Sequence, residues 1–364
     1  MIYLRTFIVL FFFGINYYVV SGKDGDQLKA VVVLYRHGDR SPLRSWPNDI
    51  YFGNSSLWPD GYGQLNNLGK ERHYKLGQWF RERYDGFLPK RYNCSDIYVR
   101  STDVDRTLMS AASNLAGLYP PEDDQVWNSA IPWQAIPIHT IPKLEDPILT
   151  HVPCPKHDRL EQELMNSEEF QKLNLELADL YKNISELTGI PSVDLNTFSL
   201  LFTTINIYKG YNLTLPDWIE YYWPEIEMYA AKHFQLHTYT DELARLRAGP
   251  FLDYLLSYFE DFNGGNSVKS KFLMLSAHDS TIGDRTNAMG VYPGAVPEFA
   301  STVIWELKNN GQIDYVNMYF KNSTDFSKLV LPGCSFDCSL SEYASLLEPL
   351  RATVDQWTIE CNEV

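Results

Sequence analysis

The stretch Ala-Val-Val-Val-Leu-Tyr-Arg-His-Gly-Asp-Arg-Ser-Pro, residues 30–42, decides the fold. Its apolar run from Val31 to Tyr35 does not alternate with polar residues, which is typical of a strand covered on both faces. Such strands belong to α/β sheets, in which ligands bind beyond the carboxyl ends of the strands. The run stops at Arg36, so the sequence predicts a buried strand that delivers cationic residues to a ligand site.

The residues beyond this strand end suit an anion. Arg36, His37 and Arg40 surround Gly38, and we expect the missing side chain of Gly38 to let a ligand come close to the backbone. An arginine presents a fork of donors that matches phosphate or carboxylate, and its charge persists at neutral pH. The cluster therefore indicates an anion-binding pocket.

Two further apolar runs end in residues of the types that bind ligands or take part in catalysis. Ile97–Val99 runs into Arg100, and Phe272–Leu275 leads through two small residues to His278 and Asp279. A single arginine or histidine at a strand end is usually a surface charge or a structural residue. Because parallel strands of one sheet share one carboxyl edge, we expect all three of these side chains to line the crevice that the first strand opens.

The chain of 364 residues is longer than one hydrophobic core usually organises. We predict an α/β fold: a doubly wound, mixed and mostly parallel sheet with helices on both faces, plus a smaller, mainly helical cap domain. Apolar residues recur at helical spacing between 155 and 247, so residues 155–247 are assigned to the cap. Residues 23–154 and 248–364 form the predicted α/β core, with one helix from about Asn67 to Tyr84.

The first residues of the chain predict where in the cell the protein is directed. Residues 1–22 resemble a cleaved secretory signal peptide, because an apolar stretch from Phe7 to Val20 ends in small residues before Lys23. An uncleaved anchor is the alternative, but the stretch is short for a membrane span. We expect no membrane span after removal of the signal peptide, and a secreted or lysosomal, lumenal location.

Five N-x-Ser/Thr sequons agree with passage through the secretory pathway. Each one alone is weak evidence. Together they predict glycosylation at Asn54, Asn93, Asn183, Asn212 and Asn322.

The five cysteines are few for a chain of this length, so disulfides would staple a domain that already has a core. We expect Cys334 and Cys338 to close a short loop and Cys154 to pair with Cys361. Cys94, inside its own sequon, is then the odd thiol.

Several other classes are disfavoured. A net charge of −15 without clustered Lys and Arg argues against a nucleic-acid partner. His233 and His237 are four residues apart on a predicted helix, but the glutamate that would follow the first histidine of a zinc motif is missing, so no metal site is expected. The nucleophile elbow G-x-S-x-G of serine hydrolases does not occur.

Residues 36–42, Arg-His-Gly-Asp-Arg-Ser-Pro, match the RHGxRxP signature of the histidine acid phosphatases, and His278-Asp279 is similar to the distal HD pair of that family. Further similarity to animal members of the prostatic and lysosomal type covers Trp58 to Tyr84, Tyr98 to Thr107 and Leu331 to Cys338. The chain thus resembles the histidine phosphatase superfamily over nearly its whole mature length, and least in the cap.

The resemblance implies hydrolysis of phosphate monoesters to alcohol and orthophosphate through a phosphohistidine, without a cofactor. His37 would be the nucleophile and Asp279 the proton donor. The phosphoryl oxygens would be held by Arg36, Arg40, Arg100 and His278. The implied substrate is a small-molecule or phosphoprotein phosphomonoester, and dimers are familiar among similar proteins.

Three alternatives stay open within this scaffold. A phytase-like inositol phosphate phosphatase shares both motifs and differs in its substrate. Phosphoglycerate-mutase-like proteins share Arg-His-Gly but lack the Arg-x-Pro continuation. A catalytically inactive secreted binding protein would have no reason to keep all of the predicted site residues.

Overall fold

The computed structural model describes residues 26–264 and 270–363, so the predicted signal peptide, residues 1–22, lies outside the described residues. The described part of the chain folds around one eight-stranded sheet in the order β3-β2-β4-β1-β5-β6-β7, with β8 paired to β6. The strands are β1 (Gln27–Arg36), β2 (Ile97–Thr102), β3 (His139–Ile141), β4 (Phe272–Ala277), β5 (Thr302–Asn309), β6 (Asp314–Lys321), β7 (Phe326–Leu329) and β8 (Cys338–Ser339).

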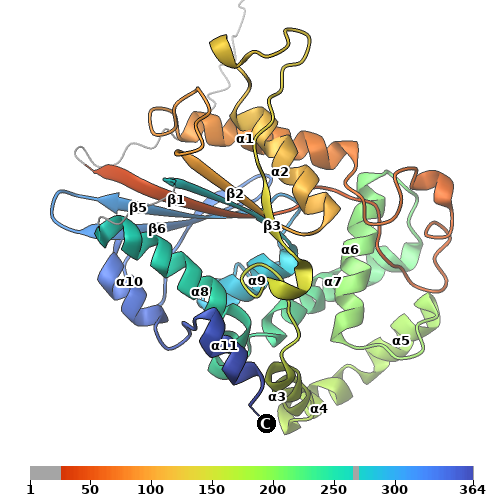
Figure 1. The fold of residues 1–364 in the computed structure, drawn as a ribbon. Coiled ribbons are helices and arrows are strands. Elements are labelled where there is room, and N and C mark those ends of the chain that lie inside the picture. The colour runs from red at the N-terminus through yellow and green to blue at the C-terminus, as the bar shows by residue number, and fades with distance from the viewer. Residues whose placement is uncertain (1–25, 265–269, 364) are drawn as a thin grey trace, which may run out of the picture.

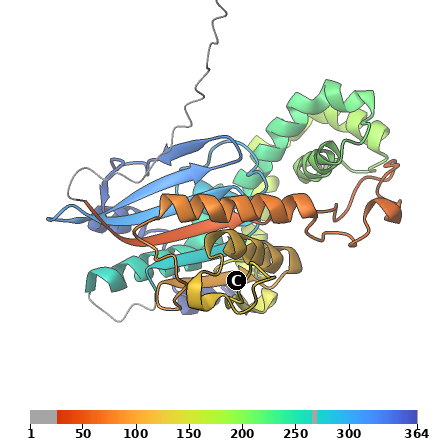
Figure 2. The same cartoon turned by 90° about the horizontal axis from the view of Figure 1, so that it is seen from above.

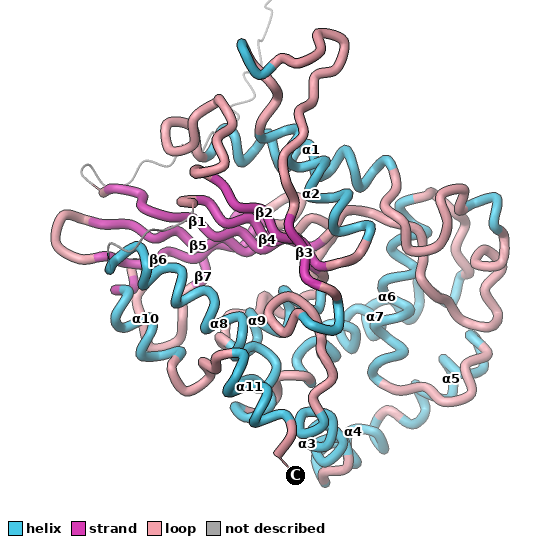
Figure 3. The backbone as a smooth tube through the Cα atoms, viewed as in Figure 1, coloured by secondary structure: helices cyan, strands magenta, loops and turns pink. Residues whose placement is uncertain are grey.

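The sheet has a parallel part and an antiparallel part. Strands β3, β2, β4 and β1 run parallel, whereas β5, β6 and β7 continue from β1 as antiparallel neighbours. Helices cover both faces (Figure 1), which Figure 3 shows as cyan coils on either side of the magenta strands. The prediction of a mixed α/β sheet with helices on both faces is therefore confirmed.

The apolar run of β1 divides between two cores. Val31, Val33 and Tyr35 pack with α1 (Asn67–Arg83) and α2 (Asp105–Leu118) on one face. Val32 and Leu34 pack with α8 (Asp241–Gly264) on the other. The lack of polar alternation in this strand is thus explained, because both of its faces are buried.

The remaining helices of the α/β part follow the later strands. Asp279 opens α9 (Asp279–Ala288) directly after β4, and α10 (Leu340–Leu347) and α11 (Val354–Cys361) close the chain. Helix α1 confirms the helix predicted from Asn67. Its start is capped by the side chain of Asn66, which accepts a hydrogen bond from the N–H of Gly69.

Five helices fill the region predicted as a cap: α3 (Pro155–Met165), α4 (Glu168–Glu176), α5 (Ala178–Thr188), α6 (Leu195–Gly210) and α7 (Asp217–Leu236). Helices α5, α6 and α7 share a hydrophobic cluster with Trp46 and Trp58 from the segment between β1 and α1. Figure 2 shows the α6 and α7 region extending beyond the end of the sheet. Helix α8 continues past residue 247 without a break, and the domain boundaries stay a prediction.

The strand register aligns the carboxyl ends of the three central parallel strands. Arg36 of β1 lies opposite Ala277 of β4, and Ser101 of β2 lies opposite Ser276. The residues that follow these strands therefore leave the sheet at one edge.

Candidate active site

The ends of β1 and β4 bring the two predicted motifs together. The backbone N–H of His37 donates to the carbonyl of Ala277 at 3.0 Å. The ring centroids of His37 and His278 are 5.6 Å apart, and Arg36 Nη2 lies 2.7 Å from Asp279 Oδ2. The site therefore combines the residues that follow two neighbouring parallel strands, as the sequence predicted.

Arg36 is held rigidly at this edge. Its Nη1 donates to the carbonyl of Pro297 at 2.5 Å, and its guanidinium carbon lies 4.1 Å from the centroid of the Phe299 ring. The side chain is buried, and within the described residues its Nε has no hydrogen-bond partner. A buried donor of this kind is costly unless a ligand satisfies it, so Arg36 is suited to an anion.

His37 is presented as a neutral imidazole with one free nitrogen. Its Nδ1 lies 2.8 Å from the carbonyl oxygen of Gly38, which can only accept, so Nδ1 carries the proton and Nε2 keeps its lone pair. Burial, together with the charges of Arg106 and Arg36, lowers the pKa of His37 well below its ordinary value. His37 can therefore act as a nucleophile even in acid.

Gly38 has a different role from the predicted one. A Cβ at this position would lie 2.5 Å from the carbonyl oxygen of Gly69, because the backbone of the loop after β1 packs directly on the first turn of α1. The Gly38 N–H donates to Ser110 Oγ of α2 at 3.0 Å. The glycine thus permits contact between backbones, not contact with a ligand, and it locks His37 between two helices.

Arg40 and Arg106 complete the positive charge of the site. Arg40 is buried, with its Nη1 donating to the carbonyl of Ser41 at 3.0 Å. Burial and the charges of Arg36 and Arg106 lower the pKa of Arg40 to about 9. Arg106 is the second residue of α2 and acts on the pKa of His37, Arg40 and His278. Arginines crowded together in this way favour a bound anion.

The structure does not bring Arg100 to this edge, so its predicted place in the crevice is wrong. Its Nη2 lies 2.5 Å from Asp146 Oδ1, and its guanidinium carbon is 5.5 Å from the centroid of the Tyr254 ring of α8. Strand β2 continues to Thr102, and Arg100 lies opposite Leu275, which faces the α8 side of the sheet. The apolar run ended at Arg100, but the strand did not.

Arg106 was missed because it lies on a helix rather than at the end of an apolar run. The feature of the sequence that could have indicated Arg106 is the polar segment between Ser101 and Thr107, which leads from β2 directly into α2. A residue in the first turn of a helix that begins at a sheet edge points its backbone donors and side chain toward that edge. This position, and not the strand end, supplies the third arginine.

His278 and Asp279 lie at the start of α9, and their surroundings keep His278 neutral and Asp279 ionised. Burial and the charge of Arg106 lower the pKa of His278 to about 3. Burial raises the pKa of Asp279, but the charges of Arg36 and Arg40 outweigh burial and hold this pKa below its ordinary value. The free site therefore holds a neutral imidazole beside a carboxylate.

A cavity of about 120 Å³ adjoins Arg40. Its walls come from the loop after β1 and from one side of α6, and they are formed by Arg40, Leu43, Arg44, Ser199, Leu200, Thr203 and Thr204. A larger cavity of about 260 Å³ lies between α4 and α7 and includes none of the predicted site residues. The smaller cavity therefore lies beside one of the predicted phosphate-binding residues.

The disulfide predictions are confirmed. Cys154 is bonded to Cys361 and Cys334 to Cys338, and Cys94 is a free, exposed thiol. Four of the sequon asparagines are exposed and the fifth, Asn322, is half-buried, so their glycosylation stays a prediction.

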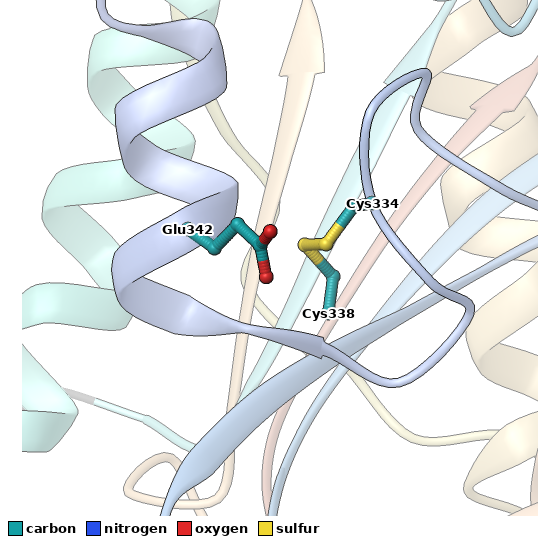
Figure 4. A group of neighbouring side chains, drawn as sticks. All are labelled: Cys334, Cys338 and Glu342. Atoms are coloured by element: carbon teal, nitrogen blue, oxygen red, sulfur yellow. A yellow bond between two sulfur atoms is a disulfide. The ribbon is translucent and has the colours of Figure 1, made fainter.

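Figure 4 shows the one group of three potential metal ligands found among the described residues, Cys334, Cys338 and Glu342. The two sulfurs are joined in a disulfide and offer no thiolate. The rings of His233 and His237 lie 5.1 Å apart, and His237 Nδ1 is 2.7 Å from Glu161 Oε1. Within the described ranges, no helix is long and apolar enough to cross a membrane.

Known proteins match nearly the whole chain. Human prostatic acid phosphatase is 37% identical over 366 residues, which cover 98% of this chain and 92% of that protein. Lysosomal acid phosphatase of Xenopus laevis is 39% identical over 348 residues, which cover 92% of this chain and 79% of that protein.

Solved structures agree on the fold. Hafnia alvei phytase in complex with myo-inositol hexakis sulphate superposes with a TM-score of 0.71 at 18% identity, over 92% of this chain and 100% of the phytase. The sequence pattern of one family matches residues 27–324. This chain therefore belongs to the histidine phosphatase superfamily (branch 2).

Proposed function

We propose that this protein is an acid phosphatase that hydrolyses phosphate monoesters to alcohol and orthophosphate through a phosphohistidine at His37 Nε2. The observation that carries the proposal is the neutral His37 ring with a free Nε2, which lies beside His278 and is acted on by the charges of Arg36, Arg40 and Arg106. The acid phosphatases to which the chain is similar support the same activity.

In the first step, Nε2 of His37 attacks phosphorus and a P–N bond forms. The bond between phosphorus and the ester oxygen breaks, and Asp279 gives its proton to that oxygen, so the alcohol leaves neutral. Arg36, Arg40 and Arg106 donate to the phosphoryl oxygens, whose charge is spread over the transferring group. Arg106 takes the phosphate-binding role that was predicted for Arg100.

In the second step, water attacks phosphorus and the P–N bond breaks. Asp279, now a carboxylate, accepts the proton that the water loses, and the electron pair of the broken bond returns to His37 Nε2. Orthophosphate leaves and both residues regain their starting protonation. The reaction consumes one water and releases one alcohol and one phosphate.

The electrostatics of the site suit acidic conditions. Burial and the neighbouring arginines hold the pKa of His37 well below its ordinary value, so its lone pair stays available in acid. The pKa of Asp279 is held down by Arg36 and Arg40 in the free site, and a bound phosphoryl group neutralises part of that charge. Substrate binding thus raises the pKa of Asp279 and prepares it to be a proton donor.

The leaving alcohol would occupy the 120 Å³ cavity next to Arg40, between the loop after β1 and α6. Because α6 of the predicted cap forms one wall of this cavity, residues of the cap would determine which substrates fit. The substrate itself and the phytase-like alternative stay predictions, as do the secreted or lysosomal location and a homodimer.

The test is His37→Asn and His37→Ala against 4-nitrophenyl phosphate at pH 5, with rapid acid quenching to trap the phosphoenzyme. We expect both variants to lose turnover by about 10⁴-fold or more and to trap no phosphohistidine. His139→Ala is the matched control, because His139 is exposed on β3 and away from the site. Trapping of phosphate on another residue, or turnover retained in the variants, would overturn the assignment.

A further inference from the structure

Thr102, the last residue of β2, contacts His278 from the side of the sheet. Its Oγ1 lies 3.1 Å from His278 Nε2 and 2.8 Å from Thr107 Oγ1 in the first turn of α2. Thr102 and Thr107 are completely buried. The two hydroxyl groups therefore form a short, buried chain that ends on the imidazole.

The direction of each hydrogen bond follows from counting protons. Thr107 Oγ1 lies 2.7 Å from the carbonyl oxygen of Val104 and 3.0 Å from that of Thr102, and a carbonyl oxygen can only accept. The single hydroxyl proton of Thr107 is thus used. When Thr107 donates to one of these carbonyl oxygens, the contact between the two hydroxyls uses the proton of Thr102, and Thr102 Oγ1 then accepts from His278.

It follows that His278 carries a proton on Nε2. In the neutral ring Nδ1 is then an acceptor, and it is the ring nitrogen that the Thr102 contact leaves for a ligand. The other tautomer would require Thr102 to donate to the ring and Thr107 to donate to Thr102, so Thr107 would give up its hydrogen bond to the carbonyl oxygens of Val104 and Thr102. The hydroxyl chain therefore holds the imidazole in one tautomer.

We propose that Thr102 is a positioning residue that, with Thr107, fixes His278 as the Nε2–H tautomer, so that the site binds a phosphoryl oxygen together with one proton. The proposal rests on the proposed function, and it takes His278 as a ligand of the phosphoryl group, as the sequence predicts. An acceptor at Nδ1 repels an unprotonated oxygen. His278 Nδ1 and the phosphoryl oxygen attract each other when the oxygen is protonated, or when the ring gains a proton at Nδ1.

The groups around His278 agree with this assignment. Arg106 of α2, Lys143, His151 and Asp279 of α9 act on its charge, and His37 packs against its ring. Burial and Arg106 keep the pKa of His278 near 3, so the ring is neutral in the free site above that pH. A proton must therefore enter with the ligand, from the substrate or from water.

The consequence is a preference for the singly protonated phosphomonoester. Phosphate esters lose their second proton near pH 6, so the monoanion is the main form in acid. The Thr102–His278 contact thereby makes substrate binding stronger in acid. This effect is separate from the proton that Asp279 gives to the alcohol.

The first experiment reads the tautomer directly. The ¹⁵N chemical shifts of the ring nitrogens distinguish Nε2–H from Nδ1–H in the free enzyme, with the signal of His278 assigned by its loss in His278→Asn. We expect Nε2–H in the wild type and in Thr102→Ser, which keeps the hydroxyl. We expect mixed tautomers in Thr102→Val, which keeps the shape but removes the acceptor. An Nδ1–H ring in the wild type would overturn the proposal.

The second experiment counts protons taken up with a ligand. Sulfate does not change its own charge between pH 5.5 and 7, so the pH dependence of its inhibition constant against 4-nitrophenyl phosphate reports protons gained by the protein. Each proton raises this constant about tenfold per pH unit. We expect the slope to be smaller by about one proton in Thr102→Val than in the wild type, and unchanged in Thr102→Ser.

The outcomes separate the two proposals. If Thr102→Val weakens sulfate equally at every pH, the threonine is only structural and the inference fails, while the phosphatase activity stands. If the wild type has no phosphatase activity, the proposed function fails. The tautomer can still be read in that case from the free enzyme. Thr107→Val, which removes the acceptor for the Thr102 proton, should lower the slope as Thr102→Val does.

Discussion

Asp279 Oδ2 lies 2.7 Å from Arg36 Nη2, so the proposed proton donor is ion-paired with a guanidinium that is proposed to bind phosphate. The side chain of Arg36 is 4% exposed and that of Asp279 is 22% exposed, so water screens this pair only in part. The pair couples two events. A phosphoryl group that binds Arg36 removes the charge that keeps Asp279 ionised.

Asp279→Asn should separate the two roles of this pair. We expect kcat for glycerol 2-phosphate to fall by about 10³-fold, because an alkoxide leaves poorly without a proton. For 4-nitrophenyl phosphate, whose leaving group needs little help, we expect a fall of about tenfold. Steady-state rates on the two substrates at pH 5 check this. Equal losses on both would show that Asp279 is not the proton donor.

Arg106 and Arg100 should respond to substitution in opposite ways. Arg106→Met removes a phosphate ligand at the edge of the sheet, so kcat/KM should fall by about 100-fold with little change in unfolding. Arg100→Met leaves Asp146 buried without its partner, so the free energy of unfolding should fall by about 3–5 kcal/mol while KM is kept. Denaturant titration and kinetics on both variants provide the measurement. A kinetic defect in stable Arg100→Met would restore Arg100 to the site.

His151 should make the fold sensitive to acid. Its Nδ1 accepts from Arg247 Nη2 and its Nε2 donates to Asp284 Oδ2, each at 2.8 Å, so the ring must be neutral. Burial lowers the pKa of His151 from 6.5 to about 4. Because the unfolded chain binds this proton more readily, stability should be lost as pH falls from about 6.5 to about 4.

His151→Gln keeps a side chain that can both donate and accept but does not titrate. Its free energy of unfolding should therefore depend less steeply on pH between 4 and 6.5 than that of the wild type. His139→Gln is the control, because the exposed ring of His139 should leave the slope unchanged. An identical slope in His151→Gln and the wild type would count against this account.

The two disulfides should differ in their effect on stability. The Cys154–Cys361 bond joins residues 207 apart and ties α3 to α11, whereas Cys334–Cys338 closes a loop of residues four apart. In the chain-entropy account, a disulfide that closes a longer loop stabilises the fold more, because it restricts the unfolded chain more. The double variant Cys154→Ser with Cys361→Ser should therefore lower the free energy of unfolding by about 4–5 kcal/mol, and the other double variant should lower it clearly less. Guanidinium titrations of both double variants test the order, and the reverse order would contradict it.

Much of this protein could be predicted from the local sequence. The double-sided apolar run of Val31 to Tyr35 identified a buried strand, and the residues after it and before α9 identified the anion site. These features are local, because burial on both faces removes polar residues from the strand itself. The cysteine pairs were also predicted correctly.

The role of Gly38 could not be read in this way. Its neighbour Gly69 lies 31 positions later in the sequence, and only the packing of α1 on the loop after β1 brings the two backbones together. The contact of Thr102 with His278 is of the same kind, because it joins the ends of two strands far apart in the chain.

The sequence by itself determined that a buried parallel sheet delivers Arg36, His37, His278 and Asp279 to one edge. Only the tertiary structure decided which further arginine reaches them. Side chains alternate along a strand, so the point at which β2 ends and the phase with which α2 begins send Arg100 to Asp146 and Arg106 to the site. Those two properties depend on the pairing of β2 with β4 and on the packing of α2 against α1 and β4, which no local pattern records.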